Sequence, residues 1–227
     1  MSEWWSYRLS SFLLFSPRTY FRLHELYNLD VWPAQLAGFG LGVVLLAVLV
    51  RRTPHASRIA ALALAVCWAF VAWAWHLAHY ATINWAATYF GAAFAIQAAL
   101  LLWFAFAGAA SPLDRALPLT RTVGTGLLVW GLVGVPIATR LLGRTLAQAD
   151  YFGTGPDPTV IATLGVFLLA PGLRRWPLWL VPVTWCAVAG AFASMMRLPD
   201  ALLAPLAALI AIVTAVGNGR MRRRVAP

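Results

Sequence analysis

Two histidines near the end of a hydrophobic stretch form the clearest chemical pattern in the sequence. His76 and His79 stand three residues apart, so on a helix both imidazole rings would point to one patch. Imidazole nitrogens are common metal ligands, and His24 is expected on the same side of the protein. The pattern predicts a metal or cofactor site built from these three histidines. An alternative stays open, in which they are interfacial histidines that hold no ligand.

A stretch interrupted by glycine and proline is the second candidate. In FGTGPDPTVIATLG, residues 152–165, Asp157 can cap a helix and Pro158 can open it. A helix that begins inside a membrane protein offers free N–H groups and a positive dipole end to a solute or anion. Thr159 and Thr163, four residues apart, would line one face of such a substrate site. The alternative is a capped turn before a short helix, with both threonines bonded to preceding carbonyls.

The composition indicates which elements must position these residues. Of 227 residues, 62% are hydrophobic, whereas a soluble domain has roughly 45–50%. At ~20 apolar residues per membrane helix, the roughly 140 hydrophobic residues of the chain correspond to about seven spans. We therefore expect an all-α fold, namely a polytopic transmembrane helix bundle preceded by an amphipathic helix in the membrane interface.

Hydrophobic runs divide the chain into three parts. Residues 1–31 predict the interfacial segment, with a helix over Ser16 to Tyr27; residues 32–217 predict the bundle, and residues 218–227 a basic tail. Spans are expected near residues 32–50, 59–80, 85–107, 123–142, 157–170, 178–196 and 201–217. The fourth should kink at Pro136. The fifth has only ~13 helical residues, or ~20 Å, so we expect it to be short or re-entrant in a ~30 Å hydrocarbon core.

The basic residues indicate orientation rather than a nucleic-acid partner. All 17 are arginine, which excludes a lysine Schiff base or a phosphate-loop lysine. They occur as pairs and triplets between hydrophobic runs, as expected for contacts with anionic lipid headgroups, and do not form one basic stripe. Counted by side, they predict that the C-terminus of this multi-pass protein lies in the cytoplasm. The expected interface anchors are Trp32, Trp85, Trp176 and Trp179.

With seven spans, one outer surface would gather several polar side chains. They are His24, Glu25, Asp30, Asn84, Asp150 and Asp157. We include Asn84 among the candidate substrate contacts for this reason. Small-residue faces at Gly38/Gly42 and Ala61/Ala65 predict close helix contacts, within the chain or with a partner in a homo-oligomer or membrane complex. The sequence requires no cofactor, and it contains no hydrolase motif that would indicate an enzyme.

Three stretches together resemble an uncharacterised family of bacterial membrane proteins. They are YRLSSFLLFSPRTYFRLHELYN at residues 7–28, WHLAHYATINWAATYFGAAFAIQA at 75–98 and FGTGPDPTVIATLG at 152–165. In order and spacing they are similar to domain-of-unknown-function family 6064. The resemblance implies a multi-helix inner-membrane protein and brings no assigned activity. We expect a permease-like or solute-binding bundle, or alternatively an accessory subunit that uses the His76/His79 patch.

Overall fold

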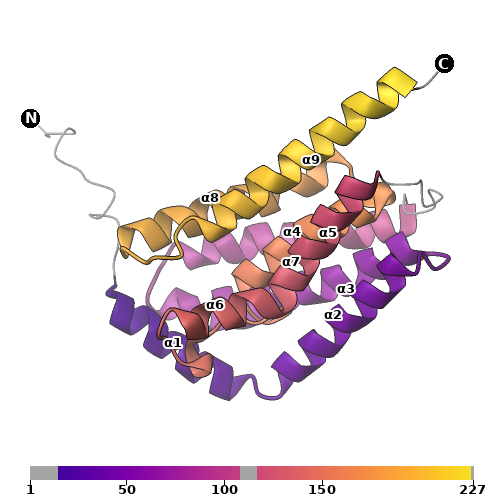
Figure 1. Cartoon of the computed structure of the whole chain (residues 1–227). Helices are drawn as coiled ribbons and strands as arrows, with labels where there is room; N and C mark the ends of the chain where they lie inside the picture. Colours follow the sequence, from indigo (N-terminus) through magenta and orange to yellow (C-terminus); the bar gives the residue numbers. More distant parts are fainter. Residues whose placement is uncertain (1–14, 108–116, 226–227) are drawn as a thin grey trace, which may run out of the picture.

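The chain is all-helical over residues 15–107 and 117–225, which the computed structural model describes (Figure 1). The expected all-α class is therefore confirmed. The first 14 residues of the predicted interfacial segment and residues 226–227 of the tail lie outside the described residues. The α-helices are α1 (Pro17–Asp30), α2 (Ala34–Val50), α3 (Ala56–Phe70), α4 (Ala87–Ala107), α5 (Pro118–Val129), α6 (Val135–Leu141), α7 (Pro156–Leu169), α8 (Trp176–Met195) and α9 (Leu203–Val225).

Several helices are long and apolar enough to cross a membrane. Within the described ranges there are four: Ala56–Thr82, Ala87–Ala107, Pro118–Leu141 and Trp176–Met195. The first of these continues α3 through a π-helical segment, η3 (Val71–His79), and a short turn, η4 (Tyr80–Thr82). Helices α1 and α2 qualify only together and are bent by 84°, which would make a fifth span. The remaining apolar helices, α7 and Leu203–Gly219, are shorter.

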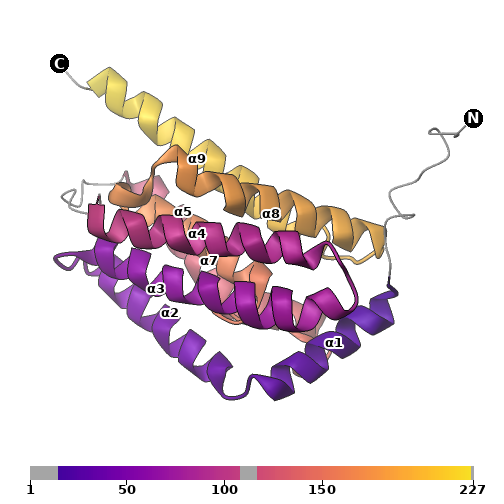
Figure 2. The same cartoon turned by 180° about the vertical axis from the view of Figure 1, so that it is seen from behind.

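Helix α7 is the centre of the bundle. Figures 1 and 2 show it enclosed by other helices from both sides. Apart from Asp157, all of its residues are buried, because its neighbours cover every face. A helix hydrophobic on all sides is expected in a protein core or as a membrane span, and α7 occupies the core. The predicted short fifth element is this helix, whose 14 residues span ~21 Å. Its ends adjoin protein, so it does not need to match the thickness of a bilayer.

Glycines let the neighbouring helices approach α7 closely. A Cβ placed on Gly165 would lie 2.6 Å from the Gly124 carbonyl oxygen and 2.6 Å from the Leu128 nitrogen. Gly131, in the π-helical segment η5 (Trp130–Gly134), would meet the Pro158 carbonyl oxygen at 2.6 Å. The backbones of α5, η5 and α7 are therefore in direct contact. Small residues allow this kind of helix packing.

A π-helical segment, η5, lies directly before Pro136, where the sequence predicted a kink. Proline has no N–H and its ring clashes with the carbonyl four residues before it. The backbone widens instead, so that the Val135 N–H donates to the Trp130 carbonyl five residues back. Helix α6 then continues towards the end of the bundle that holds α1 (Figure 1).

The small-residue faces predicted from the sequence pack inside this chain. A Cβ on Gly38 would collide with the Phe152 carbonyl oxygen, and Gly42 faces the Leu132 side chain. Ala61 and Ala65 are also buried. Gly153, which contacts Gly38, has a φ of +83°, a conformation that favours glycine. These faces hold α2 and α3 against the bundle, and a contact with a partner chain stays a prediction.

Candidate functional site

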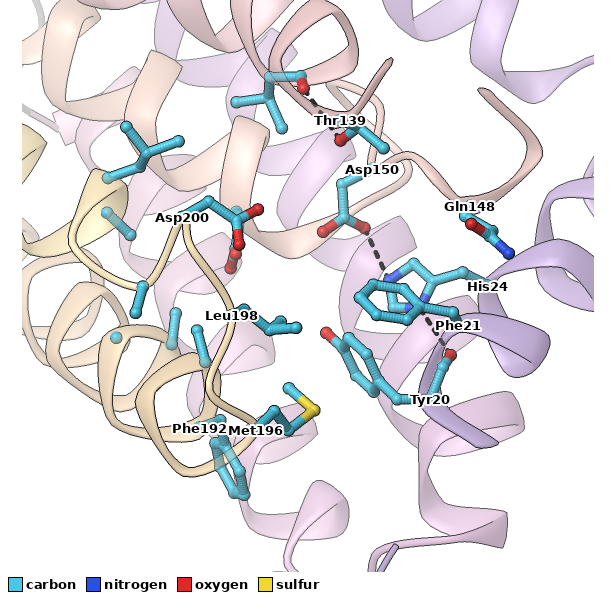
Figure 3. A pocket seen from close by; sticks show the side chains of 18 of the residues that line it. Tyr20, Phe21, His24, Thr139, Gln148, Asp150, Phe192, Met196, Leu198 and Asp200 are labelled. Atoms are coloured by element: carbon cyan, nitrogen blue, oxygen red, sulfur yellow. Dashed lines mark hydrogen bonds and ion pairs between the residues drawn. The ribbon is translucent and has the colours of Figure 1, made fainter. Parts of the chain in front are cut away.

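A cavity of about 90 Å³ lies at the end of the bundle that holds α1 (Figure 3). Its walls come from α1, the α6–α7 loop, the start of α7, α8 and the α8–α9 loop. It has room for about three water molecules, taking ~30 Å³ for each. Three of the chain's seven acidic residues line it, namely Asp150, Asp157 and Asp200. The basic groups in its lining are His24 and Arg144.

His24 and Asp150 form a buried pair in the wall of this cavity. The side chain of His24 is 3% exposed and that of Asp150 13% exposed. The Nε2 atom of His24 lies 3.2 Å from Oδ1 of Asp150, and its Nδ1 atom lies 3.0 Å from the Tyr20 carbonyl oxygen (Figure 3). Gly155 leaves space for this carboxylate, because a Cβ there would lie 2.5 Å from Asp150 Oδ1. The pair is therefore positioned by α1, through the Tyr20 carbonyl, and by the α6–α7 loop, which holds Asp150 and Gly155.

Asp157 stands in the first turn of α7, where the helix dipole favours a negative charge. The indole Nε1–H of Trp185, on α8, donates to its Oδ1 at 2.8 Å. Among the described residues, this indole is the side chain to which Asp157 is hydrogen-bonded, and no ion pair includes Asp157. A carboxylate without a cationic partner therefore faces the cavity.

Asp200 belongs to the α8–α9 loop and forms an ion pair with Arg144. The guanidinium of Arg144 also lies over the Phe21 ring, 5.0 Å from its centroid. The other carboxylate oxygen of Asp200, Oδ1, is buried and has no hydrogen-bond partner within the described part of the chain. Asp157 and Asp200 thus keep acceptor capacity that no described residue uses.

Aromatic rings complete the lining. The cavity is bordered by Tyr20, Phe21, Trp75, Tyr80, Trp185 and Phe192. Burial, followed by the charges of Asp150 and Asp157, raises the pKa of Tyr20 well above its usual value. Its phenol therefore remains neutral at any ordinary pH and contributes a hydroxyl and an aromatic face.

Side-chain bonds hold α1 to the loop that supplies Asp150. The Tyr27 hydroxyl donates to the Thr154 carbonyl at 2.6 Å, and the Asn28 amide donates to two further loop carbonyls, those of Ala147 and Ala149. Gln148 donates to Glu25 at 2.7 Å. Hydrogen bonds from Arg22 and then Gln148 lower the pKa of Glu25. We call residues 147–155 the latched loop.

The four predicted substrate contacts have different settings. Asp157 lines the cavity, whereas Thr159, Thr163 and Asn84 do not. The Thr159 hydroxyl donates to Gly155 O and accepts from Gly153 N–H, and the Thr163 hydroxyl donates to Thr159 O and accepts from the Trp68 indole. Both threonines thus form the bonds to preceding carbonyls that the alternative interpretation expected. Asn84 is buried in the η4–α4 turn and accepts from Ala86 N–H at 3.1 Å.

The three predicted metal-ligand histidines are separated. His24 lines the cavity, while His79 is bonded to Asp30 at 3.1 Å. His76 is fully buried between Phe94 and Trp185, with ring centroids 4.5 and 5.0 Å away. Because η3 is π-helical, its turns are wider and residues three apart do not share one patch. In the described ranges, no group of three or more histidine, cysteine, aspartate or glutamate side chains could hold a metal ion.

The predicted interface tryptophans are mostly at the surface. Trp32, Trp85 and Trp176 are each more than three-fifths exposed. Trp179 is instead half-buried, and its ring lies 5.6 Å from that of Phe167 on α7. An anchoring role at a lipid interface suits the first three and stays a prediction.

Sequence reasoning did not single out Asp200, Arg144 or Trp185 as site residues. The available signal was the position of the acidic residues. The chain has only seven, and three of them occur between positions 150 and 200. The topology that grouped Asp150 and Asp157 with His24 also places the 197–202 loop at the same end. Trp185 lies inside a span and carried no signal.

Over the residues that the structure describes, the protein is all-helical and strongly apolar, with four helices long enough to cross a membrane and a bent pair, α1 and α2, that could form a fifth span. The chain belongs to the family described as a family of unknown function (DUF6064), whose model matches residues 18–226. No curated protein and no solved structure matches it. Parts of the three stretches that carry the resemblance meet beside the cavity, where the Tyr27 ring lies 5.0 Å from Trp75 and its hydroxyl bonds Thr154.

Proposed function

We propose that this chain is a permease-like integral membrane protein that binds a small organic cation, of the ammonium class, in the cavity beside α1. The observation that carries the proposal is Asp157, a carboxylate without a cationic partner among the described residues, in a cavity lined by two further carboxylates. An ammonium group would donate to these oxygens through charge-assisted hydrogen bonds.

The aromatic lining supports an organic cation. Faces of tryptophan and tyrosine attract ammonium groups, most strongly where water is excluded. An anion at the start of α7, which the glycine- and proline-broken sequence suggested, would meet Asp150 and Asp157. Their negative charges outweigh the partial charge of a helix dipole, ~0.5 at most.

The membrane topology is part of the proposal. We propose seven membrane-embedded helices in a bacterial inner membrane, with α1 in the outer interface and the C-terminus in the cytoplasm. Figure 1 shows α7 running from the end that holds α1 towards the end that holds the C-terminus, which supports counting it as a crossing segment. Arg51, Arg52, Arg174 and Arg175 follow α2 and α7 at that second end, as the positive-inside rule requires of a cytoplasmic side.

Titration calorimetry of the purified full-length protein in detergent tests cation binding, with methylammonium chloride as the probe. We expect binding by the wild type and at least about tenfold weaker binding by Asp157→Asn. The substitution keeps the acceptor for Trp185 but removes the charge, and hydrogen bonds to charged groups contribute ~1.5–3 kcal/mol. Asp30→Asn is the matched control, because the Asp30 side chain is 71% exposed and does not line the cavity.

Two results would overturn the proposal. One is a wild-type protein that gives no binding signal with methylammonium; the other is unchanged affinity in Asp157→Asn. Uptake of labelled methylammonium into proteoliposomes then tests the permease-like role, and we expect faster uptake with wild-type protein than with Asp157→Asn.

A further inference from the structure

Both ring nitrogens of His24 face oxygen atoms. The Tyr20 carbonyl, 3.0 Å from Nδ1, can only accept, so Nδ1 carries a hydrogen. The other nitrogen, Nε2, lies 3.2 Å from Asp150 Oδ1. A neutral ring would then present a lone pair to an ionised carboxylate, and two acceptors form no hydrogen bond. A hydrogen bond between Nε2 and Oδ1 therefore requires one additional proton on the pair.

The contact between Nε2 and Oδ1 lies at the cavity itself. Both residues line it, and both side chains are largely buried. The titratable and charged groups around the pair are Tyr20, Glu25, Tyr80, Arg144, Asp157 and Asp200. Of these, Arg144 is bound to Asp200, while Glu25 is bound to Arg22 and Gln148 on the outer side of α1. Asp157 is thus the acidic neighbour without an ion pair of its own among the described residues.

Taking the proposed cation site as given, we infer that His24 and Asp150 hold an exchangeable proton, and that binding of an ammonium cation in the cavity releases it. An imidazolium would repel an ammonium group at short range. After the proton leaves, Nε2 and Oδ1 are both free acceptors, and ammonium N–H groups can donate to them in its place. One cation enters and one proton leaves, so the charge of the site is unchanged.

The chain contains a second pair of the same design that serves as a control. Nδ1 of His79 lies 2.7 Å from the Ala74 carbonyl, and its Nε2 lies 3.1 Å from Asp30 Oδ2. Neither residue lines the cavity. Substitution of this pair should leave cation binding and proton release unaffected.

Titration calorimetry measures proton release. Methylammonium is titrated into the full-length protein at pH 7 in phosphate and in HEPES, and the difference in binding heat between these buffers, whose ionisation enthalpies differ, gives the number of protons released. We expect about one proton released per bound cation in the wild type and in His79→Gln. In His24→Gln we expect binding with no release, because the glutamine amide donates to Asp150 without titrating. The affinity of the wild type should rise with pH more steeply than that of His24→Gln, because only the wild type has to lose the proton of the pair before the cation binds.

Asp150→Asn provides a second variant, and circular dichroism establishes that each variant is folded. Its amide can donate to Nε2, so proton release should be lost there too, together with some affinity. If the wild type binds methylammonium without releasing a proton, the exchange is overturned and the proposed function stands. The same conclusion follows if proton release persists in both folded variants. Absence of methylammonium binding at every pH would overturn both.

Discussion

At the scale of single residues, the cavity depends on side chains that no sequence motif marks. Asp150 and Asp200 follow ordinary loop patterns, and only the fold shows that they face Asp157. The sequence did indicate a common surface for His24, Asp150 and Asp157. It could not indicate Trp185, since the orientation of an indole within a span depends on how α8 packs.

Gly38 and Gly40 give a residue-scale prediction about packing. A Cβ on Gly38 would overlap the Phe152 carbonyl oxygen, which is backbone and cannot rotate away, whereas a Cβ on Gly40 would meet nothing within 4 Å. We expect Gly38→Ala to lower the free energy of unfolding by about 1–3 kcal/mol. Gly40→Ala should be neutral or slightly stabilising, because alanine is the better helix former. Thermal unfolding in detergent, followed by circular dichroism, compares the two, and equal melting temperatures would contradict the contact.

At the scale of elements, α1 and the latched loop act as one unit that positions Asp150. The hydrogen bond from the Tyr27 hydroxyl to the Thr154 carbonyl is buried. Its loss would leave a carbonyl without a partner, at a cost of about 1–3 kcal/mol. We therefore expect Tyr27→Phe to loosen the latched loop while the distant helices stay unchanged.

Hydrogen exchange followed by mass spectrometry measures this loosening. Exchange of residues 147–155 should become faster in Tyr27→Phe, with little change in α3 or α4. Tyr89→Phe is the control, since Tyr89 is 68% exposed. Unchanged exchange in the latched loop would show that α1 does not restrain it.

Prediction from sequence was most successful for elements whose hydrophobic pattern is local. The positions of the long helices and of the short helix α7 followed from hydrophobic runs, prolines and glycines. The start of α7 was predicted two residues too late, because Gly155 is the N-cap and Pro156, not Pro158, is the first helical residue. The prediction that His76 and His79 point to one patch assumed a regular α-helix. The backbone hydrogen bonds of η3 are instead those of a π-helix, which has wider turns, and the sequence VAWAWHLAH contains no pattern that predicts a π-helix.

At the scale of the whole molecule, sidedness is the property that an experiment can establish most directly. His55 is exposed between α2 and α3, and Thr145 is exposed between α6 and α7. The native cysteines, Cys67 and Cys186, are buried. In spheroplasts, an impermeant maleimide should label Thr145→Cys from outside and His55→Cys only after permeabilisation. Labelling of both from the same side would contradict the seven-segment topology.

The enclosure of α7 has a consequence for biogenesis. Its neighbours include α2, α3 and α5, which are synthesised before it, and α8 and α9, which follow. When the ribosome has just completed α7, one side of this apolar helix still has no protein partner. The native core therefore closes only when the last hairpin, α8 and α9, has been made and docked. Truncation at residue 175 should accordingly leave an assembly intermediate that is a target for membrane quality-control proteases.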